Sequence, residues 1–461
     1  MRLGLGDRIR ASPRLRALAV GLRGFVRGPT SGAPAAGGRP RARSAALPAD
    51  WDRVAELRRV GLRPASTDLY RLNLIIPTIH PAATFGGVQT ALNLFRDLAR
   101  TAPLIRIITL GPAPETKPDG WQDYEPLDLA SDETPARSVV SIAEGTAASL
   151  PVGRGDVFVA TFWTTAELAS VIRRWQSTAF GRAQLPMAYL IQDYEPGFSP
   201  WSAQSAVARA TYGDGEGTIA IFNTGQLRDY FEANGLSFSR EYAFEPRLSP
   251  SLRPFIPNGP QPRSHQIVIY GRPKTPRNAF PLIIDGLRAW AASYANARTW
   301  SVVSVGQAHP AIDVGGGVTV TSEGKLSLDA YGRLLAESAI GIALMVSPHP
   351  SYPPLEMAEL GMLVLTSRFD GKDLATWHTN IESLVEDSAD GLARQLADLC
   401  RAIEADPTRG SKGRSLRPDY VSDGPQFPFA DEVAETLRSA AGFAPGRPPG
   451  AGSDRRGPTG A

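Results

Sequence analysis

Short apolar runs alternate with amphipathic helical patterns along this chain, and this alternation constrains its fold more than any other feature. Each run is bounded by turn residues and is too short for a buried helix, which is typical of a strand covered on both faces. Strands that alternate with helices predict parallel sheets of the doubly wound type. The expected strands lie at 71–77, 105–110, 156–161, 188–191 and 218–222, and again at 266–270, 300–305, 318–321, 342–346 and 362–365.

The alternation occurs twice, which indicates two Rossmann-like α/β domains. The chain has 461 residues, more than one ordinary core holds. Residues 245–264 contain six prolines and no periodic pattern, so they are the expected connection between the domains. The expected divisions are a disordered basic leader at 1–48, domains at 49–255 and 256–425, a C-terminal helix at 426–442 that packs back on the first domain, and a disordered tail at 443–461.

The positive charge of the chain is concentrated in its leader. Residues 1–45 contain ten Arg and one acidic residue, Asp7, so they carry about +9, whereas the remainder carries about −6. Such a leader predicts either peripheral contact with acidic lipids of the inner membrane or a solvated segment without a partner, and we expect no nucleic-acid partner. No apolar run approaches the roughly 18 residues of a membrane span. With a single cysteine, Cys400, a cytoplasmic location is expected.

The stretch 342–366 has the pattern of a strand, a proline-rich turn, a short helix and a second strand. Pro353 and Pro354 suit the start of the helix, and Gly361 suits its end. Glu356 therefore lies in the first helical turn, at the carboxyl edge of a parallel sheet, where ligands bind. A carboxylate at this place is suited to the hydroxyl groups of a ribose or a sugar.

A basic turn follows the first strand of the second half. Residues 271–278 include three cations, Arg272, Lys274 and Arg277. Such a cluster at a strand-to-helix turn suits a pyrophosphate, whose charge grows as it leaves. A basic surface turn without a ligand is the alternative.

Two further motifs follow expected strands of the first half. Gly86 and Gly87 precede a helix over 88–98, where glycines let backbone N–H groups approach an anion, although a tight turn without a ligand has the same residues. Asp193 follows the strand 188–191 and is either a base or hydroxyl-orienting group, or the cap of a solvated turn. The D-x-D sequence Asp50-Trp51-Asp52 falls in a short helix expected over 50–62, so no metal site is predicted.

Taken together, these motifs resemble those of one enzyme family. The Gly-Gly loop, the basic turn and the helix from Glu356 to Gly361 are similar to those of retaining GT-B glycosyltransferases of the family 4 type. The segments QDYEPGF, GRPKTPRNAF and SPHPSYPPLEMAELG look most like those of bacterial rhamnosyltransferases of the WsaF type. The resemblance covers about residues 70–425 and implies the GT-B fold, in which two Rossmann-like domains face each other across a cleft.

The resemblance also implies roles for single residues. The cations of the basic turn would bind the donor diphosphate and Glu356 the ribose. Family members often have another Glu eight residues before the one at the position of Glu356. Position 348 is Pro here, so groups of 347–352 would replace that Glu. Asp193 falls where many members have a His-Asp pair, with Gln192 in the His position. The implied catalytic residues are Asp193, Arg272 and Arg277, and the implied substrate-binding residues are Gly86, Gly87, Lys274, Ser347, His349, Tyr352 and Glu356.

The function implied by the resemblance is sugar transfer with retention of anomeric configuration. L-Rhamnose would pass from dTDP-rhamnose to a glycan or lipid-linked saccharide in cell-surface polysaccharide synthesis, without a metal and without a cofactor other than the nucleotide-sugar co-substrate. A non-catalytic nucleotide- or glycan-binding protein on the same frame is the alternative, supported by the missing Glu at position 348. A Rossmann oxidoreductase is a third interpretation, and the absence of a GxGxxG motif counts against it.

Overall fold

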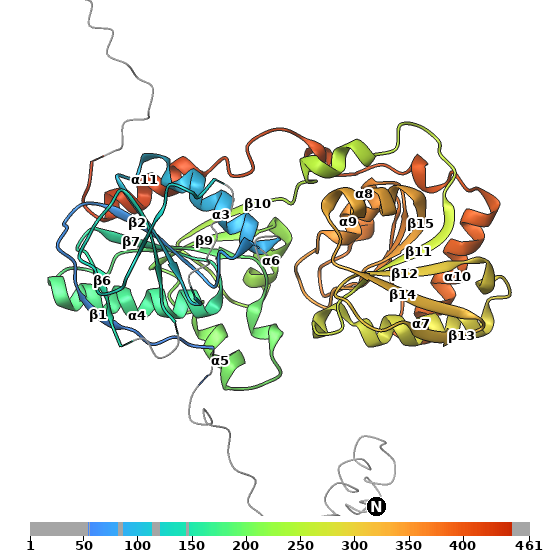
Figure 1. Ribbon diagram of the computed structural model, residues 1–461, viewed down its shortest axis with the longest axis horizontal. Helices are drawn as coiled ribbons and strands as arrows, with labels where there is room; N and C mark the ends of the chain where they lie inside the picture. The colour runs from blue at the N-terminus through green and yellow to red at the C-terminus, as the bar shows by residue number, and fades with distance from the viewer. Residues whose placement is uncertain (1–53, 55, 82–85, 113–119, 144–146, 445–461) are drawn as a thin grey trace, which may run out of the picture. The chain divides into compact units, whose positions relative to one another are not determined.

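The computed structural model describes residues 54, 56–81, 86–112, 120–143 and 147–444. They form two α/β domains, each on its own mainly parallel sheet (Figure 1), so the prediction of two Rossmann-like domains is confirmed. The expected leader and Asp50-Trp51-Asp52 lie outside the described residues, as does the expected tail apart from Phe443 and Ala444. In the described part of the chain, no helix is both long and apolar enough to cross a membrane.

The N-terminal sheet has eight strands in the order β10-β9-β8-β7-β2-β3-β5-β4, and all neighbours are parallel. Leu74 of β2 packs into a core with α3, whereas the adjacent Ile75 packs into a core with α4 and α6 on the opposite face. Burial on both faces explains why these strands are continuously apolar. The elements are β2 (Arg71–Ile76), α3 (Gly87–Leu98), β3 (Leu104–Thr109), β4 (Glu125–Leu127), β5 (Arg137–Ser141), β7 (Asp156–Ala160), α4 (Trp163–Phe180), β8 (Met187–Ile191), α5 (Ala203–Ala210), β9 (Thr218–Asn223), α6 (Gly225–Ala233) and β10 (Arg240–Phe244).

The helix predicted over 50–62 is wrong in the described part of that range. Gly61–Pro64 is a strand, β1, that pairs in parallel with β6 (Ser149–Val152). Val60 and Leu62 both pack against the core formed with α4. Contacts made by alternate residues follow the periodicity of a strand, which here overrides the local helical propensity.

The C-terminal sheet has seven strands in the order β13-β14-β12-β11-β15-β16-β17, and only the edge pair β13 and β14 is antiparallel. Its strands alternate with helices, as predicted, and Ile267 and Val268 of β11 belong to cores on opposite faces. The elements are β11 (Ser264–Gly271), α7 (Phe280–Ser293), β12 (Ser301–Gly306), β13 (Ile312–Gly315), β14 (Val318–Gly324), α8 (Leu328–Glu337), β15 (Ser338–Ile342), α9 (Pro353–Glu359), β16 (Leu363–Thr366), β17 (Ile381–Ser383) and α10 (Ala389–Ala405).

The strand predicted over 342–346 is displaced, because β15 ends at Ile342. The backbone N–H of Ala343 still bonds the Leu365 carbonyl (3.1 Å), but that of Met345 bonds the Ser367 hydroxyl (2.9 Å). The next N–H, of Val346, bonds the Arg277 carbonyl (2.7 Å). Loop groups thus replace the strand ladder, and an apolar run continues beyond the sheet into the turn that follows it.

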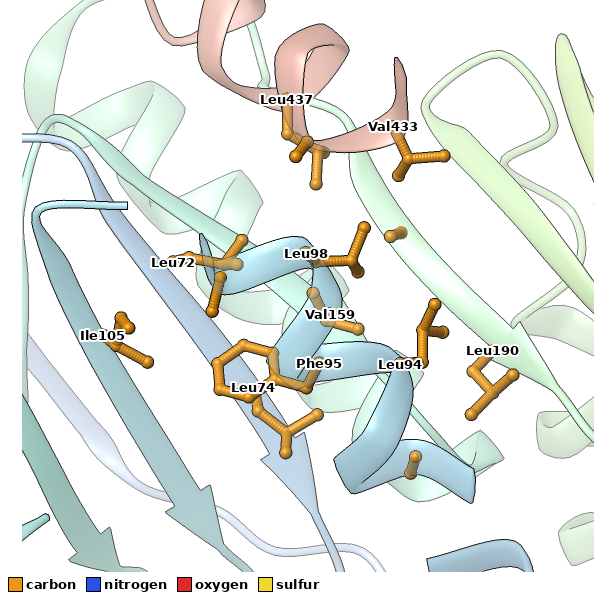
Figure 2. Packing of buried hydrophobic residues seen from close by; sticks show 14 of the residues in the cluster. Leu72, Leu74, Leu94, Phe95, Leu98, Ile105, Val159, Leu190, Val433 and Leu437 are labelled. Atoms are coloured by element: carbon orange, nitrogen blue, oxygen red, sulfur yellow. The ribbon is translucent and has the colours of Figure 1, made fainter. Parts of the chain in front are cut away.

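The last helix, α11 (Ala430–Ala440), is part of the core of the N-terminal domain. Figure 2 shows its residues Val433 and Leu437 facing the same cluster as Phe95 and Leu98 of α3. Both α11 side chains are fully buried. The chain therefore returns to its first domain after completing the second.

A buried charge network lies at the amino ends of the N-terminal strands. Asp156 accepts two hydrogen bonds from Arg71 (2.7 and 2.8 Å) and one from Arg106 (3.2 Å). Arg106 also bonds the side chain of Asn73 (2.7 Å). Burial alone would raise the pKa of Asp156, but the two guanidinium groups outweigh it and the net shift is downward. Burial lowers the pKa of Arg106 to about 9, so it remains a cation at neutral pH.

Candidate functional site

Asp193 occupies the carboxyl end of β8, as its position in the sequence predicts, and it is only 7 % exposed. Its Oδ1 accepts hydrogen bonds from the backbone N–H of Tyr194 (2.8 Å) and from the hydroxyl of Ser347. Its Oδ2 lies 3.7 Å from Nε of Arg277. Ser347 and Arg277 both belong to the C-terminal domain, so this carboxylate meets groups from the second half of the chain.

The other carboxyl group of this turn, Glu195, points into the N-terminal domain. Its Oε2 accepts hydrogen bonds from the backbone N–H of Trp163 (2.6 Å) and from the Tyr189 hydroxyl (3.2 Å). Burial raises its pKa well above the usual range. Glu195 thus joins the turn to the start of α4, which is a structural role.

The two loop glycines differ in their surroundings. Gly86 has a φ of 52°, a conformation that side chains disfavour, and a Cβ there would meet no atom of a described residue within 4 Å. A Cβ on Gly87 would lie 2.9 Å from Oε1 of Gln192, whose Nε2 bonds the Gly87 carbonyl (3.1 Å). Gly86 is thus favoured by its backbone conformation, whereas Gly87 is required by its close contact with Gln192.

The basic turn between β11 and α7 separates its cations. Lys274 is exposed, Arg272 is partly buried, and the Arg277 guanidinium lies 4.1 Å from the centre of the Phe198 ring. Burial lowers the pKa of Arg277, and the Asp193 carboxylate opposes that shift. Its Nε is buried and forms no hydrogen bond with any described residue. A cation with an unused donor is suited to a phosphate oxygen.

Glu356 lies in the first turn of α9, where the sequence predicts it. Burial raises its pKa to about 7, although the nearby Tyr331 hydroxyl opposes the shift. Burial also raises the pKa of Tyr270, while the charges of Arg272 and Glu356 shift it in opposite directions. The Tyr270 hydroxyl is thus within electrostatic reach of both, so the expected phosphate and ribose groups share one neighbourhood.

The turn 347–352 supplies three of the predicted residues. The backbone N–H of His349 bonds the Ser347 hydroxyl (3.1 Å), and the His349 Nδ1 accepts a hydrogen bond from the backbone N–H of Ser351 (3.0 Å). Burial lowers the pKa of His349 to about 4, so the ring is neutral and its hydrogen is on Nε2. The hydroxyl oxygen of Tyr352 accepts a hydrogen bond from Nδ2 of Asn223 (3.0 Å) in the N-terminal domain.

Lys372 belongs to the same group of residues, although no motif in the sequence predicts it. Its side chain is only 2 % exposed, and its ammonium donates to the carbonyl oxygens of Met345 and His349 (3.4 Å to the latter). Burial lowers its pKa to about 7, with Asp193 and Asp387 opposing the shift. A lone lysine in a loop after a strand has no motif around it. Only the topology brings it to the turn at 345–349.

Two family models match the chain, one in each domain. The model described as "WsaF, N-terminal domain" matches residues 71–225, and "WsaF, C-terminal domain" matches residues 265–397. The O-antigen biosynthesis protein RfbC of Myxococcus xanthus is 32 % identical over 245 residues, which are 53 % of this chain and 18 % of RfbC.

Solved structures with a similar arrangement are more distant. WaaG, a glycosyltransferase involved in lipopolysaccharide biosynthesis, has a TM-score of 0.48 at 12 % identity, over 79 % of this chain and 99 % of WaaG. Sucrose-phosphate synthase from Thermosynechococcus elongatus has a TM-score of 0.47 at 12 % identity, over 81 % and 94 % of the two chains. Likeness at this level says nothing about substrates.

The two family matches follow each other in the order of the observed domains and include most of the residues discussed above. They confirm the resemblance to the WsaF-type GT-B glycosyltransferases on which the sequence-based assignment rests. The chain belongs to the WsaF family and contains both of its domains, the N-terminal one before the C-terminal one.

Proposed function

We propose that this protein is a glycosyltransferase that takes its sugar from a nucleotide-diphosphate donor. The observation that carries the proposal is a contact at the carboxyl edge of the C-terminal sheet: the Val346 N–H bonds the Arg277 carbonyl (2.7 Å) and so joins the basic turn to the loop that leads into α9 and Glu356. A cation and a carboxyl group at this edge suit the diphosphate and the ribose of one nucleotide. Membership of the WsaF family supports the same assignment.

The reaction follows from the charges of the groups at this edge. Arg272 and Arg277 bind the diphosphate and stabilise the negative charge that develops as the glycosidic bond to it breaks. These side chains supply the positive charge that a metal supplies in other transferases. Asp193 orients a hydroxyl group near the reacting sugar. The leaving phosphate accepts the proton of the acceptor hydroxyl, and the sugar retains its anomeric configuration.

We further propose that the donor is dTDP-rhamnose. Pro348 stands where a sugar-binding Glu is common in similar transferases, and Val346, two residues before it, is an exposed apolar side chain (50 %). Val346 bonds the backbone of Arg277, which joins this apolar surface to the diphosphate cations. An apolar surface suits the methyl group of a 6-deoxy sugar better than a hydroxymethyl group. The RfbC relative supports an acceptor in cell-surface polysaccharide synthesis.

The test is a panel of donors, dTDP-rhamnose, dTDP-glucose, UDP-glucose and GDP-mannose, each offered with saccharide acceptors. We expect release of dTDP with sugar transfer from dTDP-rhamnose. The anomeric configuration of the product, measured by nuclear magnetic resonance, should be the same as that of the donor. Arg272→Ala should weaken dTDP binding, whereas Arg288→Ala, which removes an exposed guanidinium paired with Asp285 on α7, should not.

A non-catalytic nucleotide-binding protein is the second candidate, favoured by Pro348. It predicts that dTDP binds, that Arg272→Ala weakens this binding, and that no donor of the panel is consumed with any acceptor. That combination of results would exclude the enzyme and retain the nucleotide site. Unchanged dTDP affinity in Arg272→Ala would remove the diphosphate assignment itself.

A further inference from the structure

Lys372 is a buried cation that the proposed reaction does not use. Among the residues that the structure describes, no carboxylate oxygen lies within 4 Å of its ammonium. Burying an ammonium without an ion pair is unfavourable, so such a group is retained where something else requires it. The charges of Asp193 and Asp387 act on Lys372, and those of Asp193, Lys372 and Arg277 act on the His349 ring.

The two hydrogen-bond partners of Lys372 bracket one turn. Met345 and His349 stand on either side of the segment Val346-Ser347-Pro348, and the ammonium joins their carbonyl oxygens. Ser351, two residues after His349, has a φ of 71° although it is not glycine. A strained conformation persists only when surrounding contacts determine it, and the bond from Lys372 to the His349 carbonyl fixes the backbone that leads into Ser351.

The backbone of Lys372 is itself fixed. The N–H of Lys372 bonds the carbonyl of Phe369 (2.7 Å), and the N–H of Phe369 bonds the carbonyl of Lys372 (3.2 Å). This closed pair begins a few residues after β16, so the lysine is anchored to the sheet near its carboxyl edge. The ammonium therefore holds the turn at a fixed position relative to the sheet.

We propose that Lys372 is the positioning residue of the donor-sugar site, and that it fixes the turn 345–349 so that Ser347 and His349 face the sugar. The inference rests on the proposed function, since it assigns the sugar half of the same nucleotide-sugar site. Ser347 Oγ is held against Asp193, and the neutral His349 ring keeps an Nε2–H to donate to a sugar hydroxyl. The ligand class is a hydroxylated sugar ring next to a diphosphate.

The test compares Lys372→Met with Lys412→Met. Methionine keeps the length of the side chain and removes the ammonium, while Lys412 is a half-exposed lysine of the same domain paired with Asp406. We expect Lys372→Met to lower kcat for transfer from dTDP-rhamnose about 100-fold and to change dTDP affinity less than threefold, because the nucleotide half of the site is untouched. Lys412→Met should match the wild type. Added ethylamine should restore part of the activity of Lys372→Ala.

A second measurement does not depend on catalysis. In the wild type the His349 ring stays neutral down to about pH 4, and its resonance can be assigned by its loss in His349→Gln. The Lys372 charge itself lowers the His349 pKa, so Lys372→Met should raise the midpoint of this titration even if the turn stays in place. If Lys372 holds the turn, the loss of burial should raise the midpoint further, to about the 6.5 of an exposed histidine. A midpoint still clearly below that value together with unchanged kcat would overturn the proposal. If the wild type consumes no donor, the proposed function fails, and the titration alone decides on Lys372.

Discussion

The two domains use buried charge in opposite ways. In the N-terminal domain, Asp156 is surrounded by Arg71 and Arg106, and each charged group has a partner. In the C-terminal domain, the partners of Lys372 among the described residues are backbone carbonyls only, and burial raises the pKa of Glu356 to about 7. The first arrangement lies at the amino ends of strands and the second near the carboxyl edge of a sheet.

The difference separates stability from function. A paired buried charge contributes to a unique fold, and breaking it leaves an uncompensated ion. Buried groups without ion partners cost folding free energy, so they indicate a site where a ligand is expected to complete them. Four substitutions can test this division between the domains.

Asp156→Asn should have the largest effect. It leaves Arg71 and Arg106 buried without a counter-charge, so the free energy of unfolding should fall by about 3–5 kcal/mol. Urea denaturation followed by circular dichroism measures this loss. A fall below about 1 kcal/mol would show that the network is dispensable, and the contrast between the domains would disappear.

Arg277→Ala should reduce activity much more than stability, in contrast to Asp156→Asn. Transfer, measured as kcat/KM for the donor, should fall about 100-fold because a diphosphate cation is lost. The free energy of unfolding should change by less than about 1 kcal/mol, since Asp193 keeps its hydrogen bonds to Ser347 and to the backbone. A large loss of stability without a specific loss of activity would place Arg277 with the structural charges instead.

Glu356→Gln should stabilise the protein above neutral pH. The folded-state pKa of about 7 lies above the unfolded value of 4.5, so the native state binds the extra proton between these values and the wild type loses stability as pH rises through this window. Glutamine cannot ionise. The variant should equal the wild type near pH 4 and exceed it by about 2–3 kcal/mol at pH 8, while binding dTDP more weakly. Equal stability of the two proteins at both pH values would refute the burial of this carboxyl.

Asp132→Ala should have the smallest effect. Asp132 pairs with Arg63, and its side chain is 68 % exposed. Exposed pairs contribute little, so the free energy of unfolding should change by less than about 1 kcal/mol. The same denaturation assay as for Asp156→Asn provides the comparison, and similar losses in both variants would mean that burial does not decide the outcome.

The sequence predicted most of the fold because parallel strands buried on both faces must be continuously apolar. The prediction of secondary structure failed at two places where the local pattern of residues does not determine the structure. Gly61–Pro64 was missed because a short edge strand has too few residues for a clear period. The end of β15 was misplaced because Ala343 to Met345 stay buried beyond the sheet.

The candidate site could be predicted only in part. Asp193, Arg277 and Glu356 follow strands or begin a helix, and the strand and helix pattern of the sequence predicts such positions in a parallel sheet. Their mutual contacts depend on tertiary structure, as does the role of Tyr270, which is an ordinary strand residue in the sequence. Lys372 was missed because its partners are main-chain carbonyls, which have no residue-type signal.

The position of α11 has a consequence for how the chain is made. Residues 427–441, with Val433 and Leu437 of α11, complete a core whose other buried members come from residues before 245, whereas the strands and α10 of the C-terminal domain lie within residues 264–405. Domains usually fold in the order in which the ribosome releases them. Here the domain synthesised first cannot close its core until the last helix emerges. We expect the domain synthesised second to be the first to fold completely, with the apolar face of α3 dependent on chaperones until then.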